Sequence, residues 1–125
     1  MKRIISTPNA PAAIGPYSQA VEANGTLYVS GQIPIDPATG KLVDGDVTAQ
    51  AQQVFRNIKA ILDEAGYSFG DVVKSTVYLS DMASFADVNA VYKEFYQTEC
   101  PARAAFAVKG LPLGSLVEIE TIAVK

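Results

Sequence analysis

The stretch from Val47 to Ala65 constrains the fold more than any other part of this chain. Its apolar residues fall at positions 47, 51, 54, 55, 58, 61, 62 and 65, which is the spacing of one face of an α-helix. Asp46 can cap the start of such a helix, and Gly66 stands where a left-handed glycine commonly ends one. The pattern therefore predicts a helix over 47–65 that buries one face against another layer.

The segments around this helix have the alternating or β-branched pattern of strands. We expect strands over 2–6, 17–23, 26–30, 72–79, 103–109 and 116–124, with the last two forming a pair joined by a turn over 110–114. Asn24-Gly25 is a strong signal for a two-residue hairpin, because both positions tolerate positive φ, and residues 34–46 are expected to form a surface loop. A second helix is predicted over 84–97, where Ser84 and Asp87 resemble a capping box.

The order β-β-β-α-β-α-β-β indicates an α/β fold of the α+β kind, with one domain over residues 1–125. Because both helices connect strands, right-handed crossovers place them on the same face of one mixed sheet. The opposite face would stay uncovered, with residues such as Tyr78 or Phe106 on it. A chain of 125 residues cannot cover that face alone, so we expect oligomerisation through the sheet and pockets at the subunit boundaries.

The composition removes most catalytic chemistries. The chain has no histidine and one cysteine, Cys100, which excludes Ser-His-Asp triads, Cys-His pairs and most metal sites, and we expect no metal and no organic cofactor. The net charge of −3 disfavours nucleic acid as a partner, and no apolar run is long enough to span a membrane. A lone cysteine cannot form an intramolecular disulfide, and the N-terminus does not resemble a signal peptide, so a reducing cytoplasm is the expected compartment.

Two glutamates on the last predicted strand need an explanation. Side chains alternate along a strand, so Glu118, Glu120 and Ile122 share one face. Arg103 is the nearest cation in the sequence that could pair with one of these glutamates, in its own or a neighbouring subunit. Its planar guanidinium could instead hold a small anionic ligand bidentately. A glutamate beside Arg103 would tend to be ionised and a buried one would have a raised pKa, and the spacing leaves both questions open.

Several segments of the chain together match a known pattern. They are APAAIGPYSQ at residues 10–19, SGQIP at 30–34, DVNAVY at 87–92, and PAR at 101–103 with VEIE at 117–120. On these residues the chain resembles the RidA (YjgF) family, and the match extends over essentially its whole length. The resemblance implies a chorismate-mutase-like fold, a homotrimer, and three sites in the clefts between subunits.

The resemblance also implies an activity. Members of the family hydrolyse reactive enamine and imine intermediates, such as 2-aminoacrylate, 2-iminopropanoate and 2-iminobutanoate, to 2-keto acids and ammonia. Carried over by position, Arg103 would bind the substrate carboxylate and Glu118 would orient or activate the attacking water, while the pocket would be lined by Tyr17, Ser30, Gly31 and Asn89.

One position departs from the family pattern. Many relatives have a cysteine two positions after the arginine, where this chain has Ala105, so no role of that thiol applies here. The chemistry does not require one, because an iminium carbon is already electrophilic and needs only a held carboxylate, a placed water and proton transfer. The main alternative is a regulatory or chaperone-like protein that binds a small carboxylate in the same pocket without turnover.

Overall fold

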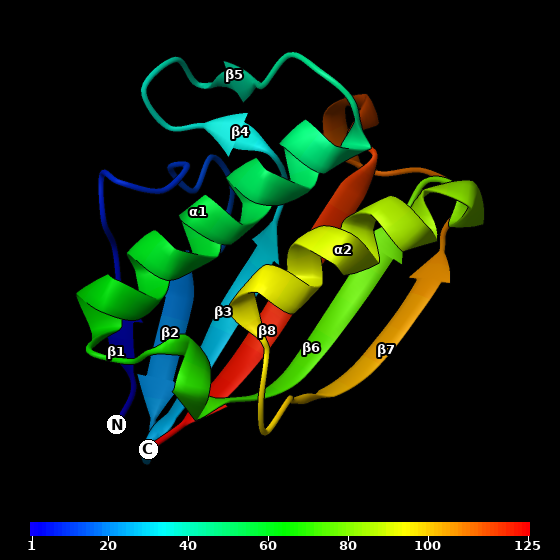
Figure 1. Ribbon diagram of the computed structural model, residues 1–125. Coiled ribbons are helices and arrows are strands. Elements are labelled where there is room, and N and C mark those ends of the chain that lie inside the picture. The colour runs from blue at the N-terminus through cyan, green and yellow to red at the C-terminus, as the bar shows by residue number, and fades with distance from the viewer.

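The computed structural model describes residues 1–125, and the predicted long helix crosses one face of its sheet (Figure 1). Helix α1 (Val47–Ala65) begins where Oδ1 of Asp46 accepts a 3.0 Å hydrogen bond from the backbone N–H of Ala49. It ends at Gly66, whose φ is 81°. The prediction over 47–65 and both of its end signals are therefore confirmed.

Six strands form one mixed sheet in the spatial order β1-β2-β3-β8-β6-β7. Their bounds are β1 (Arg3–Ile5), β2 (Ala20–Ala23), β3 (Thr26–Gln32), β6 (Val72–Leu79), β7 (Ala102–Ala107) and β8 (Val117–Val124). β6 and β7 are parallel, and all other neighbours are antiparallel. The segment predicted as a surface loop contains a separate small hairpin, formed by β4 (Ile35–Asp36) and β5 (Lys41–Leu42).

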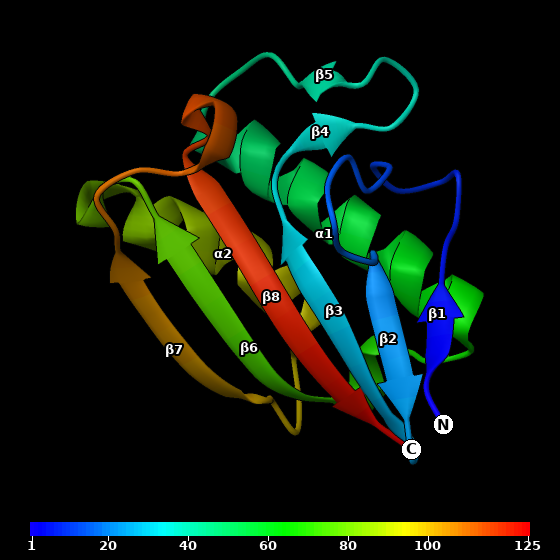
Figure 2. The ribbon, with the colours of Figure 1, turned by 180° about the vertical axis from the view of Figure 1, so that it is seen from behind.

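Both helices lie on one face of this sheet, and Figure 2 shows from behind that no other element covers the opposite face. The second helix, α2 (Phe85–Phe95), connects β6 to its parallel neighbour β7. The predicted α+β architecture, a mixed sheet with two helices on one face, is confirmed. Neither helix combines the length and apolar character that crossing a bilayer requires.

Aromatic rings fix α2 to α1. Phe55 of α1 stacks on Phe95 of α2 with ring centroids 4.5 Å apart, and the rings of Tyr92 and Tyr96 meet it edge-on at 5.8 and 6.0 Å. Such pairs add geometric preference to the burial of apolar area. The position of α2 beside α1 is therefore defined by rigid side chains.

The last two strands do not pair with each other, contrary to the prediction. β6 lies between β7 and β8, so the segment that links these strands passes the end of β6 instead of forming a hairpin turn. Two backbone hydrogen bonds hold it there, from Val108 N–H to the Leu79 carbonyl at 2.8 Å and from Ser80 N–H to the Leu116 carbonyl at 3.1 Å. A short 3₁₀ turn, η3 (Pro112–Gly114), lies within this link.

Several predicted element ends also differ from the observed ones. β2 begins at Ala20 instead of residue 17, because the Gln19 side chain is engaged with the N-terminal loop, accepting from Thr7 N–H at 2.7 Å and donating to the Pro11 carbonyl at 2.8 Å. Ser84 makes no capping hydrogen bond, since the 3₁₀ turn η2 (Met82–Ser84) precedes α2 and is capped by Asp81. α2 stops at Phe95 instead of residue 97.

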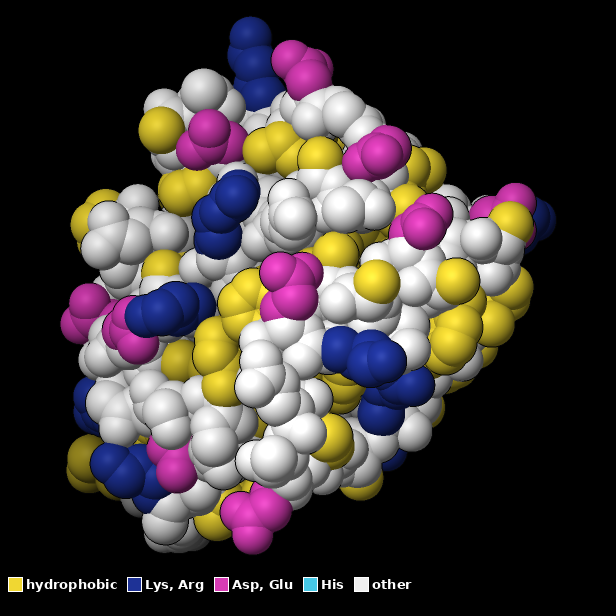
Figure 3. All heavy atoms as spheres, viewed as in Figure 1, with side chains coloured by type: hydrophobic (Ala, Val, Ile, Leu, Met, Phe, Trp, Pro, Cys, Tyr) yellow, Lys and Arg dark blue, Asp and Glu magenta, His cyan; other side chains and the backbone are white.

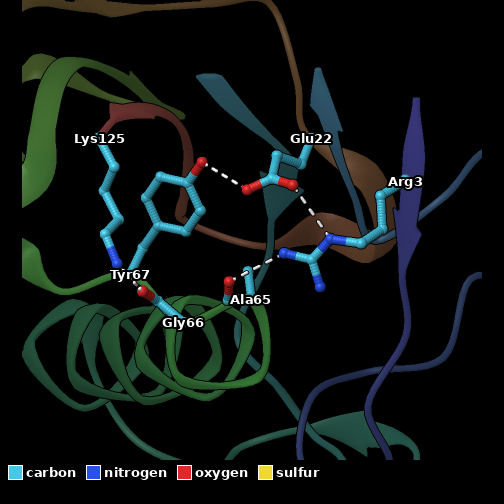
Figure 4. Close-up of polar contacts among 6 residues, drawn as sticks. All are labelled: Arg3, Glu22, Ala65, Gly66, Tyr67 and Lys125. Carbon is cyan, nitrogen blue, oxygen red and sulfur yellow. Dashed lines mark hydrogen bonds and ion pairs between the residues drawn. The ribbon is translucent and has the colours of Figure 1, made fainter. Parts of the chain in front are cut away.

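A polar network ties both chain ends to the C-terminal end of α1 (Figure 4). Nη2 of Arg3 donates to the Ala65 carbonyl at 3.0 Å, and Nζ of Lys125 donates to the Gly66 carbonyl at 2.9 Å. Both cations therefore complement the negative end of the helix dipole.

Glu22 lies at the centre of that network. Its carboxylate accepts from Nε of Arg3 at 3.0 Å and from the hydroxyl of Tyr67 at 2.7 Å. The hydrogen bond from Arg3 lowers the pKa of Glu22, and burial together with the bond to Glu22 raises the pKa of Tyr67 to about 12. The network joins β1, β2 and the segment after α1.

The uncovered face carries large apolar side chains. Tyr78 and Phe106 are cross-strand neighbours on it, with ring centroids 5.5 Å apart, as predicted. Tyr28, Phe106 and Val124 are each more than two-fifths exposed, at 51%, 45% and 44%. The helix side, in contrast, has charges of both signs scattered over it, with hydrophobic atoms gathered along the edge that bears β7 (Figure 3). The apolar surface thus lies on the open face and the β7 edge.

Candidate active site

A cavity of about 630 Å³ opens at the end of the sheet where β8 begins. Four of the predicted site residues line it: Tyr17, Ser30, Gly31 and Glu118. Most of the remaining wall is apolar and comes from the N-terminal loop, the end of β3, the small hairpin and η3, with Pro11, Ile14, Ile33, Ile35, Pro112 and Leu113 among its residues. A mainly apolar hollow with a few converging polar groups is typical of a small-molecule site.

A β-bulge shapes the floor of this cavity. Val29 pairs with Thr121 and Gln32 with Ile119, so Ser30 and Gly31 together oppose a single residue of β8. The Ser30 hydroxyl donates a 2.6 Å hydrogen bond to the Ser18 carbonyl, which fastens the bulge to the N-terminal loop. The sequence suggested that β3 ends at residue 30, whereas the strand continues through the bulge to Gln32.

Gly31 makes room for the carboxylate of Glu118. A Cβ built on Gly31 would overlap Oε2 of Glu118 and would lie 3.0 Å from its Cδ. The φ of Gly31 is not in the left-handed region, so glycine is required here for space and not for backbone conformation. The absence of a side chain at residue 31 therefore allows Glu118 to lie against the bulge.

Glu118 is half-buried on the open face of the sheet. Burial, with a smaller contribution from the neighbouring charge of Glu120, raises the pKa of Glu118. Glu120 lies two residues further on and accepts a 2.8 Å hydrogen bond from the Tyr78 hydroxyl. Within one chain burial is the main cause of this shift, and no cation of the same chain is among its causes.

Arg103 and Asn89 form a second group. Nη1 of Arg103 donates a 2.7 Å hydrogen bond to Oδ1 of Asn89, and its Cζ lies 4.7 Å from the centre of the Tyr92 ring. Arg103 lies on β7, the edge strand, with its guanidinium against α2 and open to solvent. It pairs with no glutamate of its own chain.

The two groups are separate within one chain. Arg103 is in register with Ser75 of β6, whose side chain is buried on the helix side, whereas Glu118 is in register with Tyr78 on the open face. Arg103 and Glu118 are thus on opposite faces of the sheet and two strands apart. An ion pair between them inside one subunit, one of the possibilities that the sequence raised, is excluded by this geometry.

The sequence reasoning did not identify two features of the site. The first is Leu113 of η3, which lines the cavity with a left-handed backbone (φ 58°) and a side chain that is 66% exposed. The second is Phe85, whose ring lies 5.5 Å from Cζ of Arg103. The Pro112-Leu113-Gly114 tripeptide predicts a turn, but the neighbouring sequence does not indicate that this turn lies beside a cavity. No cluster of three or more potential metal ligands occurs in the chain.

The fold and the site together define a class of protein: a small α+β domain with a half-buried carboxylate in an apolar cavity and a separate, exposed arginine. Its residues 7–125 match the family described as Endoribonuclease L-PSP. The chain belongs to this family, which is the RidA (YjgF) family.

Similar proteins carry more than one name. A mouse (Mus musculus) protein named 2-iminobutanoate/2-iminopropanoate deaminase is 53% identical over 125 residues, which are 100% of this chain and 93% of that protein. A RutC family protein of Pyrococcus horikoshii is 56% identical over 125 residues, 100% of this chain and 99% of that protein. The crystal structure of E. coli TdcF with bound serine is similar with a TM-score of 0.94 and 44% identity over 98% of each chain.

Proposed function

We propose that this protein is a deaminase that hydrolyses imine and enamine forms of small 2-amino acids to 2-keto acids and ammonia. The observation that carries the proposal is the carboxylate of Glu118, half-buried with a raised pKa at the floor of an apolar cavity that Tyr17 and Ser30 also line. A carboxylate whose pKa is moved toward neutrality is a better proton acceptor for a water molecule. The deaminase name of the mouse relative supports the substrate class.

The site is completed, in this proposal, by a neighbouring subunit of a homotrimer. Arg103 is exposed on an edge strand and faces away from the Glu118 of its own chain, so a second copy is the simplest source of a cation for the cavity. The apolar open face, with Tyr28 and Phe106, supplies surface for such an assembly. Light scattering should give about three times the chain mass of 13.2 kDa, and a stable monomer would remove this part of the proposal.

The reaction then needs little from the protein. Arg103 and Asn89 of one subunit hold the substrate carboxylate, and Glu118 of the next places a water molecule against the imine carbon. The water oxygen bonds to this carbon as Glu118 takes one of its protons and the C=N π electrons move onto the nitrogen. Glu118 then gives that proton to the nitrogen of the carbinolamine, the C–N bond breaks with its electron pair leaving on ammonia, and the hydroxyl group loses its proton as the C=O bond of the keto acid forms.

The second candidate is a protein that binds a small carboxylate without turnover. Two observations favour this second candidate: serine is bound in the crystal structure of E. coli TdcF, and the relatives carry different names. It requires the same cavity and the same arginine, but it requires no proton transfer by Glu118.

Ammonia release distinguishes the two candidates. The substrate 2-iminobutanoate is generated in the cuvette by a dehydratase, and ammonia formation is followed with and without the protein. Glu118→Gln should abolish the acceleration, while Glu120→Gln is the matched control on the same face, because its carboxylate bonds to Tyr78 and does not line the cavity. No acceleration by the parent protein, combined with retained binding of 2-ketobutanoate, would favour the binding protein.

A further inference from the structure

Three side chains of α2 surround the guanidinium of Arg103. Phe85, Asn89 and Tyr92 are four and three residues apart, so they form one stripe along the helix. Asn89 accepts the 2.7 Å hydrogen bond from Nη1, and the rings of Tyr92 and Phe85 lie 4.7 and 5.5 Å from Cζ. The aromatic faces attract the cation through their quadrupoles. The stripe thus contacts Arg103 at three points.

These contacts leave one edge of the guanidinium unoccupied. Nη1 is engaged with Asn89, whereas Nε and Nη2 of Arg103 make no hydrogen bond to any group of the chain. Nε and Nη2 lie side by side, and such a pair can donate two parallel hydrogen bonds to the two oxygens of one carboxylate. The open edge therefore has the geometry of a carboxylate receptor.

We propose that Phe85 and Tyr92 are positioning residues, which act with Asn89 to hold Arg103 so that its Nε–Nη2 edge is presented to a ligand carboxylate. This positioning role depends on the proposed function in one respect only, namely that Arg103 is the group that binds the ligand carboxylate. A free arginine side chain loses much rotamer freedom on binding, and an arginine that is already held by α2 loses less. The affinity and the direction of the ligand would both depend on the two rings.

The Tyr92 ring is a rigid platform. It is 6% exposed, and its centroid lies 5.8 Å from that of Phe55 and 4.7 Å from that of Tyr96, so it cannot turn away from Arg103 without disturbing the core. Its hydroxyl is buried and makes no hydrogen bond to Arg103. The aromatic face, and not the hydroxyl, is therefore the part of Tyr92 that acts on Arg103.

The test measures how strongly the protein prefers a carboxylate over a neutral ligand of the same shape. Calorimetry gives the Kd of 2-ketobutanoate and of its primary amide, 2-ketobutanamide, for each variant, and thermal unfolding checks the fold. Tyr92→Leu removes the ring, Tyr92→Phe removes the hydroxyl alone, and Phe85→Leu removes the half-buried second ring. Phe69→Leu is the matched control, because it removes a ring of the same aromatic cluster that packs against Phe95 and Tyr96 but not against Tyr92 or Arg103.

We expect Tyr92→Leu to lower the preference for the carboxylate about tenfold and Phe85→Leu to lower it about threefold, in line with cation–π contacts that are partly desolvated. Tyr92→Phe and Phe69→Leu should leave the preference within about twofold of the parent, although Phe69→Leu lowers the unfolding temperature. The expected changes differ because Tyr92→Leu and Phe85→Leu each remove a ring that contacts Arg103, whereas the other two substitutions leave both of these rings in place.

Three results would overturn the inference. They are an unchanged preference in both Tyr92→Leu and Phe85→Leu, an equal loss of preference in Phe69→Leu, and no preference in the parent protein. If Tyr92→Leu does not fold, Phe85→Leu decides alone, since Phe85 lies at the edge of the core. Failure of the proposed function is a separate outcome: the preference responds as expected while ammonia release from 2-iminobutanoate is not accelerated.

Discussion

Replacing Gly31 with alanine tests the placement of Glu118 with a single methyl group. The added Cβ would overlap Oε2 of Glu118 and lie 3.0 Å from Cδ and 3.3 Å from Cγ, so the carboxylate must move. Because the φ of Gly31 is not in the left-handed region, alanine brings no backbone strain of its own. The consequence of Gly31→Ala should therefore come through Glu118.

The loss of stability should be small and the loss of activity large. Overpacking a core costs about 1–3 kcal/mol, but here the clash involves the flexible end of a half-buried side chain, so we expect about 1 kcal/mol or less. A catalytic group displaced by about 1 Å can lower the rate about 10²-fold. We accordingly expect kcat for ammonia release to fall about 100-fold in a protein whose unfolding temperature drops by a few degrees.

A double-mutant cycle identifies the cause. Gly31→Ala, Glu118→Ala and the double variant are unfolded by denaturant, and the penalty of Gly31→Ala should disappear when Glu118 is already truncated. Gly110→Ala adds the same methyl group where no atom lies within 4 Å, and it serves as the control. The reasoning fails if Gly31→Ala keeps kcat within threefold of the parent, or if its stability penalty is the same in both backgrounds.

Further predictions concern the charged groups. Arg103→Lys keeps the charge but loses the planar fork, so kcat/KM should fall about ten- to a hundredfold while light scattering shows an unchanged assembly; near-normal activity would contradict the carboxylate clamp. Glu118→Gln should lower kcat by about 10²–10⁴-fold with little change in the Kd of 2-ketobutanoate, and a smaller effect would show that another group activates the water. In the parent, kcat should fall as the pH drops through the raised pKa of Glu118, and a pH–rate profile with no such limb would rule out its role as base. Arg3→Ala should destabilise the protein at neutral pH, and denaturant titrations should show a smaller difference in acid. The Arg3–Glu22 contribution is present above the unfolded pKa of Glu22 and is lost as the pH falls through its lowered folded pKa, whereas the Arg3 bond to the Ala65 carbonyl remains.

Local patterns predicted the elements better than their arrangement. Helix α1 could be bounded to the residue, because its apolar stripe and the signals at Asp46 and Gly66 are contained in the sequence around it. The pairing of the last strands could not be predicted in this way, because the place of β8 between β3 and β6 depends on contacts with residues far away in the chain. A turn-forming segment such as 110–114 is compatible with a hairpin and with a link that passes another strand.

The site was predictable as a set of residues but not as a geometry. The family resemblance named Tyr17, Ser30, Gly31 and Glu118, and the structure brings them to one cavity, although their roles remain proposals. Ser30-Gly31 has the same sequence whether a strand ends there or bulges, and only the register with β8 distinguishes the two. The separation of Glu118 from the arginine likewise follows from strand order, which no local pattern contains.

The central place of β8 has a consequence for synthesis. β8 is the last strand of this chain, yet it pairs with β3 on one side and β6 on the other. Until the ribosome has delivered it, the two halves of the sheet share no hydrogen bond, and the face of α1 that Val117, Ile119 and Ala123 cover in the folded chain stays open to solvent. The nascent polypeptide must therefore wait for β8 before it can close its core, and during that interval it presents the kind of surface that chaperones bind.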